Sequence, residues 1–361
     1  MNISTPEQIK ELLHQSLGKV GQFQHCALLD RPGHCNVGDH LIWMGELFYL
    51  TDVLKTRINY TANIYNFSDK EMEERIGEAP ILLSGGGNLG DLWPDEQDFR
   101  EKIISKYKDR PIFILPQTIY FTQTENLHKT AKVFNSHPQL TIFVREMRSY
   151  EIATKNFDGC RVLMAPDMAF QLVNMPEVFL KPKLKDSWLF LCRQDKELEE
   201  KIPRSSLGLK NISVEDWAAF KYKDRQPRIE KLLGWLRLIS GTKNRDELII
   251  NSWVSRQVWK YFHPYVAKLN YIHDAESQHK SWNLIHHGFY QFSQYPLAIT
   301  NRLHGHILCL ILKIPHIFLP NAYYKNEAFY ETWTSQVSFC RFVKSKAEIK
   351  PAVQELLELS F

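Results

Sequence analysis

Pro80-Ile-Leu-Leu-Ser84-Gly-Gly-Gly-Asn-Leu-Gly-Asp91 is a short apolar run that ends directly in three glycines. A run of this length that stops at a glycine turn is typical of a buried strand in a parallel sheet. Similar runs recur through the first half of the chain, at 26–29, 58–65, 112–115, 140–144 and 162–164, and segments with helical periodicity separate them. Strands that alternate with helices predict an α/β fold built on a parallel sheet.

A second set of strands and helices follows a break in this pattern. Residues 173–186 carry two prolines and three lysines with little periodicity, which predicts a linker. Strands are then predicted at 188–192, 248–250, 297–300 and 316–319, and helices near 228–240, near 281–293 and at 303–312. The sequence therefore predicts two Rossmann-like domains, at 1–178 and 187–361, that face each other across a cleft in the glycosyltransferase-B-like arrangement.

The composition limits the classes of function. Of 361 residues, 45 are Lys or Arg and 41 are Asp or Glu, a net charge of +4, and a nucleic-acid binder usually shows a more concentrated basic stripe. A mildly basic chain suits anionic substrates or contact with an anionic membrane face. The six cysteines form no C-x-x-C pair, residues 1–18 lack an apolar signal core, and the apolar stretch 307–320 is too short and polar to span a bilayer. These features predict a protein of the reducing cytosol.

Two copies of the pattern N-x-G-D, Asn36-Val-Gly-Asp39 and Asn88-Leu-Gly-Asp91, each lie between a predicted strand and a predicted helix. Ligands of α/β proteins bind at this place, outside the carboxyl ends of the strands. Glycine permits a close backbone approach, which leaves amide N–H groups to meet an anion or a sugar hydroxyl. Two ordinary tight turns are the alternative interpretation.

A cationic cluster, Thr300-Asn-Arg-Leu-His-Gly-His306, joins a predicted strand to a predicted apolar helix. Asn301 is expected to cap the helix, whose positive N-terminal end would then face the cleft. Arg302 beside His304 would form an anion site with a titratable group next to it. In the alternative, Arg302 forms a structural salt bridge and His304 packs in the core. The anion site is favoured because a buried Arg without a partner is costly.

Two further cations stand at comparable positions. Arg193 directly follows the predicted strand 188–192, and Lys325 lies in the loop Asn321-Ala-Tyr-Tyr-Lys-Asn326, where a solvated lysine is the alternative. The chain has no dinucleotide-binding G-x-G-x-x-G, Walker lysine, H-E-x-x-H or G-x-S-x-G motif. None of the 14 histidines has the spacing of a recognisable zinc or iron site, so no metal and no cofactor is predicted.

The chain resembles the polysaccharide pyruvyltransferase family, and within it the branch that modifies exopolysaccharides and capsules, from about Leu28 to Thr334. The similarity rests on seven blocks that are loose individually and specific together. They are DRPGHCNVGDHLIW at 30–43, SGGGNLGDLWP at 84–94, LPQT at 115–118, VREMRS at 144–149, PDMA at 166–169, TNRLHGH at 300–306 and NAYYKN at 321–326. The resemblance implies phosphoenolpyruvate as donor and co-substrate, a sugar acceptor, a ketal product and no metal.

The resemblance assigns the donor side of the reaction to the second predicted domain. The R-L-H segment is where such enzymes hold and protonate phosphoenolpyruvate, which implies catalytic roles for Arg302 and His304. Arg193, Lys325 and Asn301 are the further donor-binding residues that the pattern implies. The chain departs from the family at Asn301, where Asp is common, and in the lysine loop, where Gly often replaces the second tyrosine.

The acceptor side is assigned to the first predicted domain. Ketal formation needs a proton on the donor's methylene carbon and attack by two sugar hydroxyls, so His304 is the expected acid. Asp39 or Asp91 is expected to deprotonate or orient the hydroxyls, and the other acceptor-loop residues are Asn36, Gly38, Gly86, Gly87 and Asn88. The expected acceptor is a lipid-linked oligosaccharide or saccharide at the inner membrane face. The linker lysines could assist peripheral membrane contact, with surface solvation as the alternative.

Two other functions fit parts of the pattern. A glycosyltransferase that uses nucleotide sugars would share the fold and would also place an Arg on a phosphate. The second predicted domain, however, offers no convincing Glu or Asp for a ribose. The other hypothesis is a non-catalytic subunit that binds polysaccharide precursors, and the retention of Arg302 and His304 argues against it. The sequence leaves open the acceptor sugar, the position of the ketal and the oligomeric state.

Overall fold

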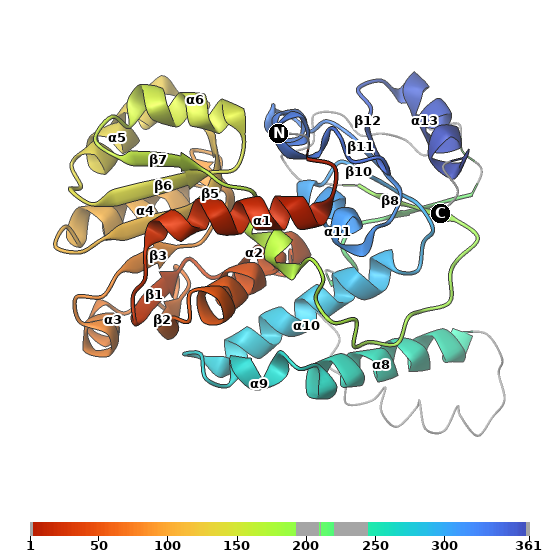
Figure 1. Ribbon diagram of the computed structural model, residues 1–361, viewed down its shortest axis with the longest axis horizontal. Coiled ribbons are helices and arrows are strands. Elements are labelled where there is room, and N and C mark those ends of the chain that lie inside the picture. Colours follow the sequence, from red (N-terminus) through yellow and green to blue (C-terminus); the bar gives the residue numbers. More distant parts are fainter. Residues whose placement is uncertain (1–2, 193–208, 210, 220–244, 359–361) are drawn as a thin grey trace.

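The computed structural model describes residues 3–192, 209, 211–219 and 245–358. Within these ranges the protein is an α/β structure with two parallel sheets, one from each half of the chain (Figure 1). The prediction of an α/β fold with parallel sheets is confirmed. The predicted linker 173–186 contains neither helix nor strand.

The first sheet has the strand order β2-β1-β3-β5-β6-β7, and β4 pairs with the far end of β5. Every predicted strand of this half is present within a few residues. Its strands are β1 (His25–Leu29), β2 (Arg57–Ala62), β3 (Ile81–Leu83), β4 (Gly86–Gly90), β5 (Ile112–Tyr120), β6 (Leu140–Val144) and β7 (Arg161–Met164). The helices are α1 (Pro6–Leu17), α2 (Val37–Phe48), α3 (Asp69–Ile76), α4 (Pro94–Lys106), α5 (Thr124–Asn135) and α6 (Met147–Asn156).

The second sheet has the order β12-β11-β10-β8-β9 and lies at the right of Figure 1. Its strands are β8 (Trp188–Leu191), β9 (Ile212–Glu215), β10 (Ala298–Thr300), β11 (His316–Phe318) and β12 (Cys340–Phe342). The helices of this half are α8 (Arg245–Phe262), α9 (Val266–Leu269), α10 (Ala275–Phe292), α11 (Leu303–Leu312), α12 (Lys325–Phe329) and α13 (Lys346–Glu358). Because all strands in each sheet are parallel, their carboxyl ends meet at one edge, where ligands bind.

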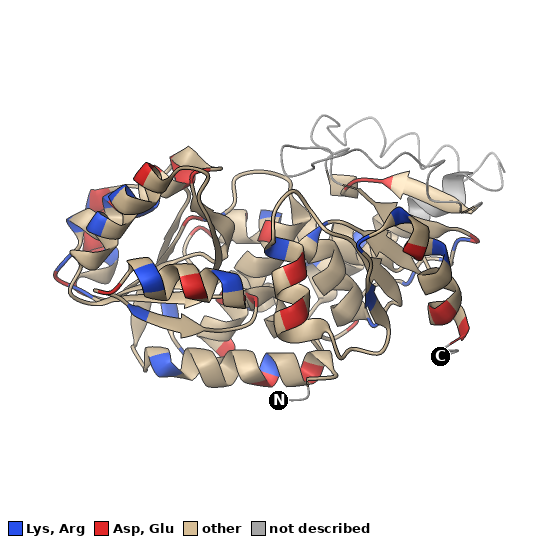
Figure 2. Ribbon diagram, turned by 90° about the horizontal axis from the view of Figure 1, so that it is seen from above, with Lys and Arg blue, Asp and Glu red and all other residues tan. Residues whose placement is uncertain are grey.

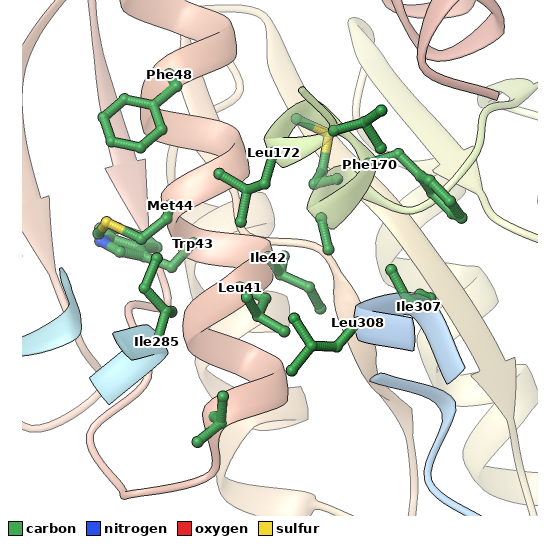
Figure 3. Packing of buried hydrophobic residues seen from close by; sticks show 14 of the residues in the cluster. Leu41, Ile42, Trp43, Met44, Phe48, Phe170, Leu172, Ile285, Ile307 and Leu308 are labelled. Carbon is green, nitrogen blue, oxygen red and sulfur yellow. The ribbon is translucent and has the colours of Figure 1, made fainter. Parts of the chain in front are cut away.

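Helix α2 packs between the two halves of the chain. Every residue of α2 except Asp39 is buried, as expected of a helix that is apolar on all sides. One hydrophobic cluster joins α2 side chains such as Leu41 to Ile285 of α10 and to Ile307 and Leu308 of α11 (Figure 3). This shared core brings the start of α11 close to the loops of the first sheet. The domain boundary between 178 and 187 stays a prediction.

One predicted element of the second half is wrong. Residues 248–250, predicted as a strand, lie inside α8. A three-residue apolar run cannot distinguish a buried strand from one turn of a long helix, and the length of the surrounding segment decides between them. The helix predicted near 228–240 lies outside the described residues.

The surface carries both signs of charge. Lys and Arg alternate with Asp and Glu along the outer helices in Figure 2. In the part of the chain that the structure describes, no helix combines the length and the apolar character needed to cross a membrane.

Candidate functional site

A pocket of about 420 Å³, lined by both polar and apolar side chains, opens at the carboxyl ends of the first sheet's strands, against the start of α11. Its lining comes from the loop after β1, the glycines after β3, the residue after β6, and the first residues of α11 and α12. A concave site at this edge is where α/β folds bind ligands. Of the predicted site residues, the pocket brings together Asn36, Asp39, Gly86, Gly87, Asn88, Arg302, His304 and Lys325.

His304, in the first turn of α11, touches the first turn of α2. A Cβ atom added at Gly38 would lie 2.4 Å from His304 Nδ1 and 2.7 Å from His304 Cβ. Only glycine leaves room for the ring at this point, because any side chain would overlap it. The glycine of the first N-x-G-D copy is thus explained by the contact with His304.

Asp167 lies on the other side of the His304 ring. Its Oδ2 is 3.5 Å from His304 Nε2 and 2.6 Å from Arg145 Nη1, and the carboxylate is fully buried. The contact with His304 is at ion-pair distance, and Nε2 has no hydrogen-bond partner among the described residues. Burial alone would raise the pKa of Asp167, but His304, Arg145 and the Ala169 N–H hold it well below its usual range. Asp167 therefore stays charged and can stabilise a protonated His304.

Arg145 directly follows β6 and reaches the pocket beside Gly87. Its Nε donates to Thr118 Oγ1 at 2.9 Å, and its Nη1 donates to Asp167. A Cβ atom at Gly87 would lie 3.0 Å from Arg145 Nη2, so the small residue makes room for the guanidinium. Arg145 is only 1% exposed and is held by two partners, which makes it a preorganised cation in the pocket wall.

Arg302 and Lys325 add positive charge from the second half of the chain. Arg302 Nε and Nη2 donate to the two carboxylate oxygens of Asp216, at 2.7 Å each. This bidentate pair is the structural salt bridge that the sequence offered as the alternative, and Arg302 lines the pocket as well. Lys325 opens α12, is 4% exposed, and places its Nζ 5.0 Å from the ring centroid of Tyr323.

A buried carboxyl group on α2 holds the glycine loop after β3 in place. Glu46 of α2 accepts hydrogen bonds from Ser84 Oγ at 2.8 Å and from the Gly85 N–H at 2.6 Å. Burial raises the pKa of Glu46 to about 8, although these two hydrogen bonds oppose the shift. Gly86 has φ of 135°, a backbone conformation that side chains disfavour. The loop backbone at the pocket floor is thus fixed by α2.

The loop after β1 forms another wall. Asn36 caps α2, since its Oδ1 accepts the Gly38 N–H at 3.3 Å, and its Nδ2 donates to Asp39 Oδ2 at 2.7 Å. Asp39 Oδ2 is also 3.5 Å from His34 Nε2, and the Asp39 side chain is 34% exposed. Asp39 is therefore an accessible, oriented carboxylate on the same pocket as His304.

A buried network below this wall orients Asn88. Asp30 Oδ2 accepts from Asn88 Nδ2 at 3.2 Å and from Arg100 Nη2 at 3.3 Å, and Arg100 Nη2 also donates to Asn88 Oδ1 at 2.7 Å. Burial raises the pKa of Asp30, and Arg100 offsets part of the shift. Two aromatic rings, Tyr65 and Trp93, line the same pocket, and Tyr65 is 82% exposed. Such rings can stack on the apolar face of a sugar.

The second N-x-G-D copy differs from the first in local structure. Asn88 lies inside β4, whereas Asn36 begins a helix. Asp91 does not line the pocket; it accepts the Thr122 N–H at 2.8 Å and the Gln123 N–H at 2.9 Å. The pattern N-x-G-D therefore occurs in two unrelated backbone conformations. In the second copy, Asp91 anchors the loop before α5.

Of the two other predicted donor-site residues, Asn301 does not line the pocket. The prediction that Asn301 caps α11 is wrong: the cap residue is Arg302, which has no side-chain capping bond, and Thr300 Oγ1 accepts the Arg302 N–H at 3.0 Å. The chain turns into the helix one residue later than the preference for Asn suggests, and Asn301 is buried behind it. Arg193 lies outside the described residues.

Sequence reasoning missed the pair of Arg145 and Asp167. Arg145 directly follows β6, so the rule that singled out Arg193, a cation at the carboxyl end of a strand, would have found it. Asp167 follows β7 by three positions and stands in the block PDMA, but the sequence could not show its partners, which lie 22 and 137 positions away. Among the described residues, the group of side chains that could hold a metal ion is His306, His316 and Cys340, and it lies outside the pocket lining.

The fold and the pocket define a parallel α/β protein with a ligand site at its strand ends that carries both cationic side chains and carboxylates. A family model described as polysaccharide pyruvyl transferase matches residues 36–323. The chain belongs to this family, and the match confirms the resemblance seen in the sequence blocks. It is accordingly a transferase of polysaccharide biosynthesis by family.

Two relatives agree with this assignment, and one solved structure has a similar fold. A Bacillus subtilis (strain 168) protein named "Putative pyruvyl transferase EpsO" is 28% identical over 348 residues, which cover 95% of this chain and 97% of that protein. "Pyruvyl transferase 1" of Schizosaccharomyces pombe is 27% identical over 85% of this chain and 69% of its own length. The crystal structure of a functionally uncharacterized Klebsiella pneumoniae protein superposes with a TM-score of 0.56 at 19% identity, over 93% of this chain and 99% of that one, and supports the fold alone.

Proposed function

We propose that the protein transfers the pyruvyl group of phosphoenolpyruvate to a sugar of a bacterial surface polysaccharide precursor, forming a cyclic ketal and releasing phosphate. One observation carries the proposal: a histidine 3.5 Å from a buried carboxylate shares a pocket with Arg145, Arg302 and Lys325. Phosphoenolpyruvate brings a carboxylate and a phosphate, and preorganised cations stabilise both in a site of low dielectric. Membership of the polysaccharide pyruvyl transferase family supports a pyruvyl donor.

In the proposed reaction His304 supplies the proton that the donor needs. Protonation of the methylene carbon makes the adjacent carbon electron-poor, and a sugar hydroxyl attacks that carbon. The bond between this carbon and the bridging oxygen then breaks, phosphate leaves with the bonding pair, and a second hydroxyl closes the ketal ring. Asp167 lies 3.5 Å from His304 Nε2, so its charge stabilises the protonated acid before transfer.

The acceptor is proposed to bind against the loop after β1. Asp39 is the accessible carboxylate of this wall and is oriented by Asn36, which suits it to take protons from the attacking hydroxyls. Tyr65 and Trp93 offer ring faces to the sugar. Because cationic side chains are available for the donor's charges, the proposal includes no metal ion in the pocket.

The proposed acceptor is attached to a lipid carrier, so that the protein works beside the inner membrane face. Of the linker lysines, Lys181 pairs with Glu177 at 2.6 Å and Lys185 donates to Tyr295 Oη at 2.6 Å. These contacts favour the surface-solvation and structural roles of the lysines over membrane contact. Membrane association is therefore proposed to come through the acceptor's lipid.

The test follows atoms from donor to products. Phosphoenolpyruvate labelled with heavy oxygen at the bridging position is incubated in heavy water with the protein and a panel of lipid-linked oligosaccharides and simple glycosides. The proposal expects the label in the released phosphate, one deuterium in the new methyl group and a ketal on the sugar, all by mass spectrometry. Label retained in pyruvate, or turnover with nucleotide sugars instead, would contradict it; acceptor binding without phosphate release would indicate a non-catalytic subunit.

A further inference from the structure

A second cluster of reactive side chains lies on the far side of α11 from the pocket. His306 comes from α11, His316 from β11 and Cys340 from β12, and all three are completely or almost completely buried. One potential ligand atom from each lies within 4.8 Å of the others. His306 Nδ1 is 2.7 Å from His316 Nε2 and 3.7 Å from Cys340 Sγ. The three elements thus direct two imidazoles and a thiol at one point.

In each imidazole, the nitrogen that points away from the other histidine (the outer nitrogen) has a polar partner elsewhere. His316 Nδ1 lies 2.8 Å from the Ile314 carbonyl oxygen, which it can reach only as a donor. His306 Nε2 lies 3.1 Å from Thr334 Oγ1. A carbonyl or hydroxyl oxygen on the outer nitrogen is the arrangement that orients metal-binding histidines and fixes their tautomers. The inner nitrogens, His306 Nδ1 and His316 Nε2, hydrogen-bond to each other and are the two that could bind a shared metal ion in place of this bond.

A fourth donor stands next to this group. Cys309 lies three positions after His306 on α11, so both side chains project from the same face of the helix. It is fully buried, but its Sγ is outside the group of described ligand atoms that lie within 4.8 Å of one another, so its side chain must move closer to bind the ion. Two thiols and two imidazoles form the donor set that Zn²⁺ takes in structural sites.

We propose that His306, His316 and Cys340, with Cys309 as the fourth ligand, bind a structural zinc ion. Two nitrogens bound to one tetrahedral zinc are about 3.3 Å apart, so the imidazoles separate by roughly half an ångström on binding. His306 moves its proton from Nδ1 to Nε2 and then donates to Thr334 Oγ1. Cys309 and Cys340 each release a proton, which leaves two thiolates and a neutral site.

The zinc site serves the helix that carries His304. His304 lies two positions before His306, and it faces the pocket while His306 faces β11 and β12. A zinc ion would tie α11 to both strands and so fix the position of the histidine at the helix start. The inference does not depend on the identity of the donor or acceptor, because no cluster residue lines the pocket.

The test measures metal in the intact protein, purified without a polyhistidine tag. If the proposal is right, elemental mass spectrometry should find about one zinc ion per chain. Cobalt substituted for zinc should give a thiolate-to-cobalt charge-transfer band. Both signals should be lost in Cys340→Ser and retained in Cys26→Ser, a control at a buried free cysteine of β1.

A second measurement covers the case in which Cys340→Ser fails to fold. Unfolding the wild-type protein in the presence of a colorimetric chelator should release one equivalent of zinc, and removing the metal before heating should lower Tm by several degrees. The proposal is wrong if the folded wild-type protein contains only traces of metal and its Tm does not change when zinc is added. Zinc retained at full stoichiometry in folded Cys340→Ser and His316→Ala overturns it as well.

Discussion

Substitution of Gly38 tests whether the contact between α2 and α11 positions the reactive histidine. A methyl group at this position would lie 2.4 Å from His304 Nδ1, and an ordinary contact needs about 3.5 Å. The imidazole or the helix must therefore move by roughly 1 Å in Gly38→Ala. A displacement of that size in a catalytic group costs about 10²-fold in rate, which corresponds to about 2.7 kcal/mol of transition-state stabilisation.

The expected result is a fall of about 10²-fold in kcat with little change in donor binding. Phosphate release measures turnover, and calorimetry with phosphoenolpyruvate measures binding. Helix propensity alone favours alanine over glycine by about 1 kcal/mol, so a loss of activity would not come from a weaker helix. Gly18→Ala is the matched control, because a Cβ atom there meets nothing within 4 Å and the backbone is right-handed helical.

A double-mutant cycle separates this contact from a general disturbance. His304→Gly alone should lower kcat by about 10²–10⁴-fold. Adding Gly38→Ala to it should cost almost nothing further, since both the ring and the Cβ atom that the new methyl group would meet are gone. Equal effects of Gly38→Ala in both backgrounds would refute the reasoning, and so would a Gly38→Ala variant with kcat within two- to threefold of wild type.

Three further substitutions address the charges around the pocket. Arg302→Ala should raise the KM for phosphoenolpyruvate roughly 10- to 150-fold in steady-state kinetics, the effect of losing a charged hydrogen-bond partner; an unchanged KM would leave Arg302 only its ion pair with Asp216. Asp167→Asn should lower the free energy of unfolding by about 3–5 kcal/mol in urea titrations, because Arg145 is left buried without its charged partner. Since the folded-state pKa of Asp167 is depressed, its contribution is present above about pH 4 and lost in stronger acid, and a constant difference down to the lowest pH would contradict this. The pKa of Glu46 is raised from 4.5 to about 8, so wild-type stability should fall as pH rises through this window, and Glu46→Gln should flatten the fall measured by Tm against pH.

Much of the secondary structure follows from local pattern. The helix predicted at 303–312 is α11, Leu303–Leu312, and the strand predicted at 140–144 is β6, Leu140–Val144. Both are apolar runs bounded by polar or turn-forming residues. An apolar run with such clear bounds is enough to predict a buried helix or strand at that place. β4 escaped prediction because Gly86–Gly90 contains three glycines, which strands disfavour; its pairing with β5 holds it.

The pocket depends partly on local pattern and partly on packing. The rule that ligand residues gather at the carboxyl ends of parallel strands places Asn88 and Arg302 each at the edge of its own sheet. That the two edges meet in one pocket was decided by the packing around α2. The sequence could not show that Arg302 pairs with Asp216, because β9 had no clear strand pattern.

What the sequence by itself determined is the α/β class, the family blocks and the positions of the reactive side chains at strand ends and helix starts. These depend on periodicity and turn residues within a few positions of each other. The contact of Gly38 with His304, and the ion pairs of Asp167 with Arg145 and His304, were decided only by the tertiary structure. They join residues from separate elements, and the contacts of His304 exist because helix α2, buried at every residue except Asp39, packs against α10 and α11 in one shared core.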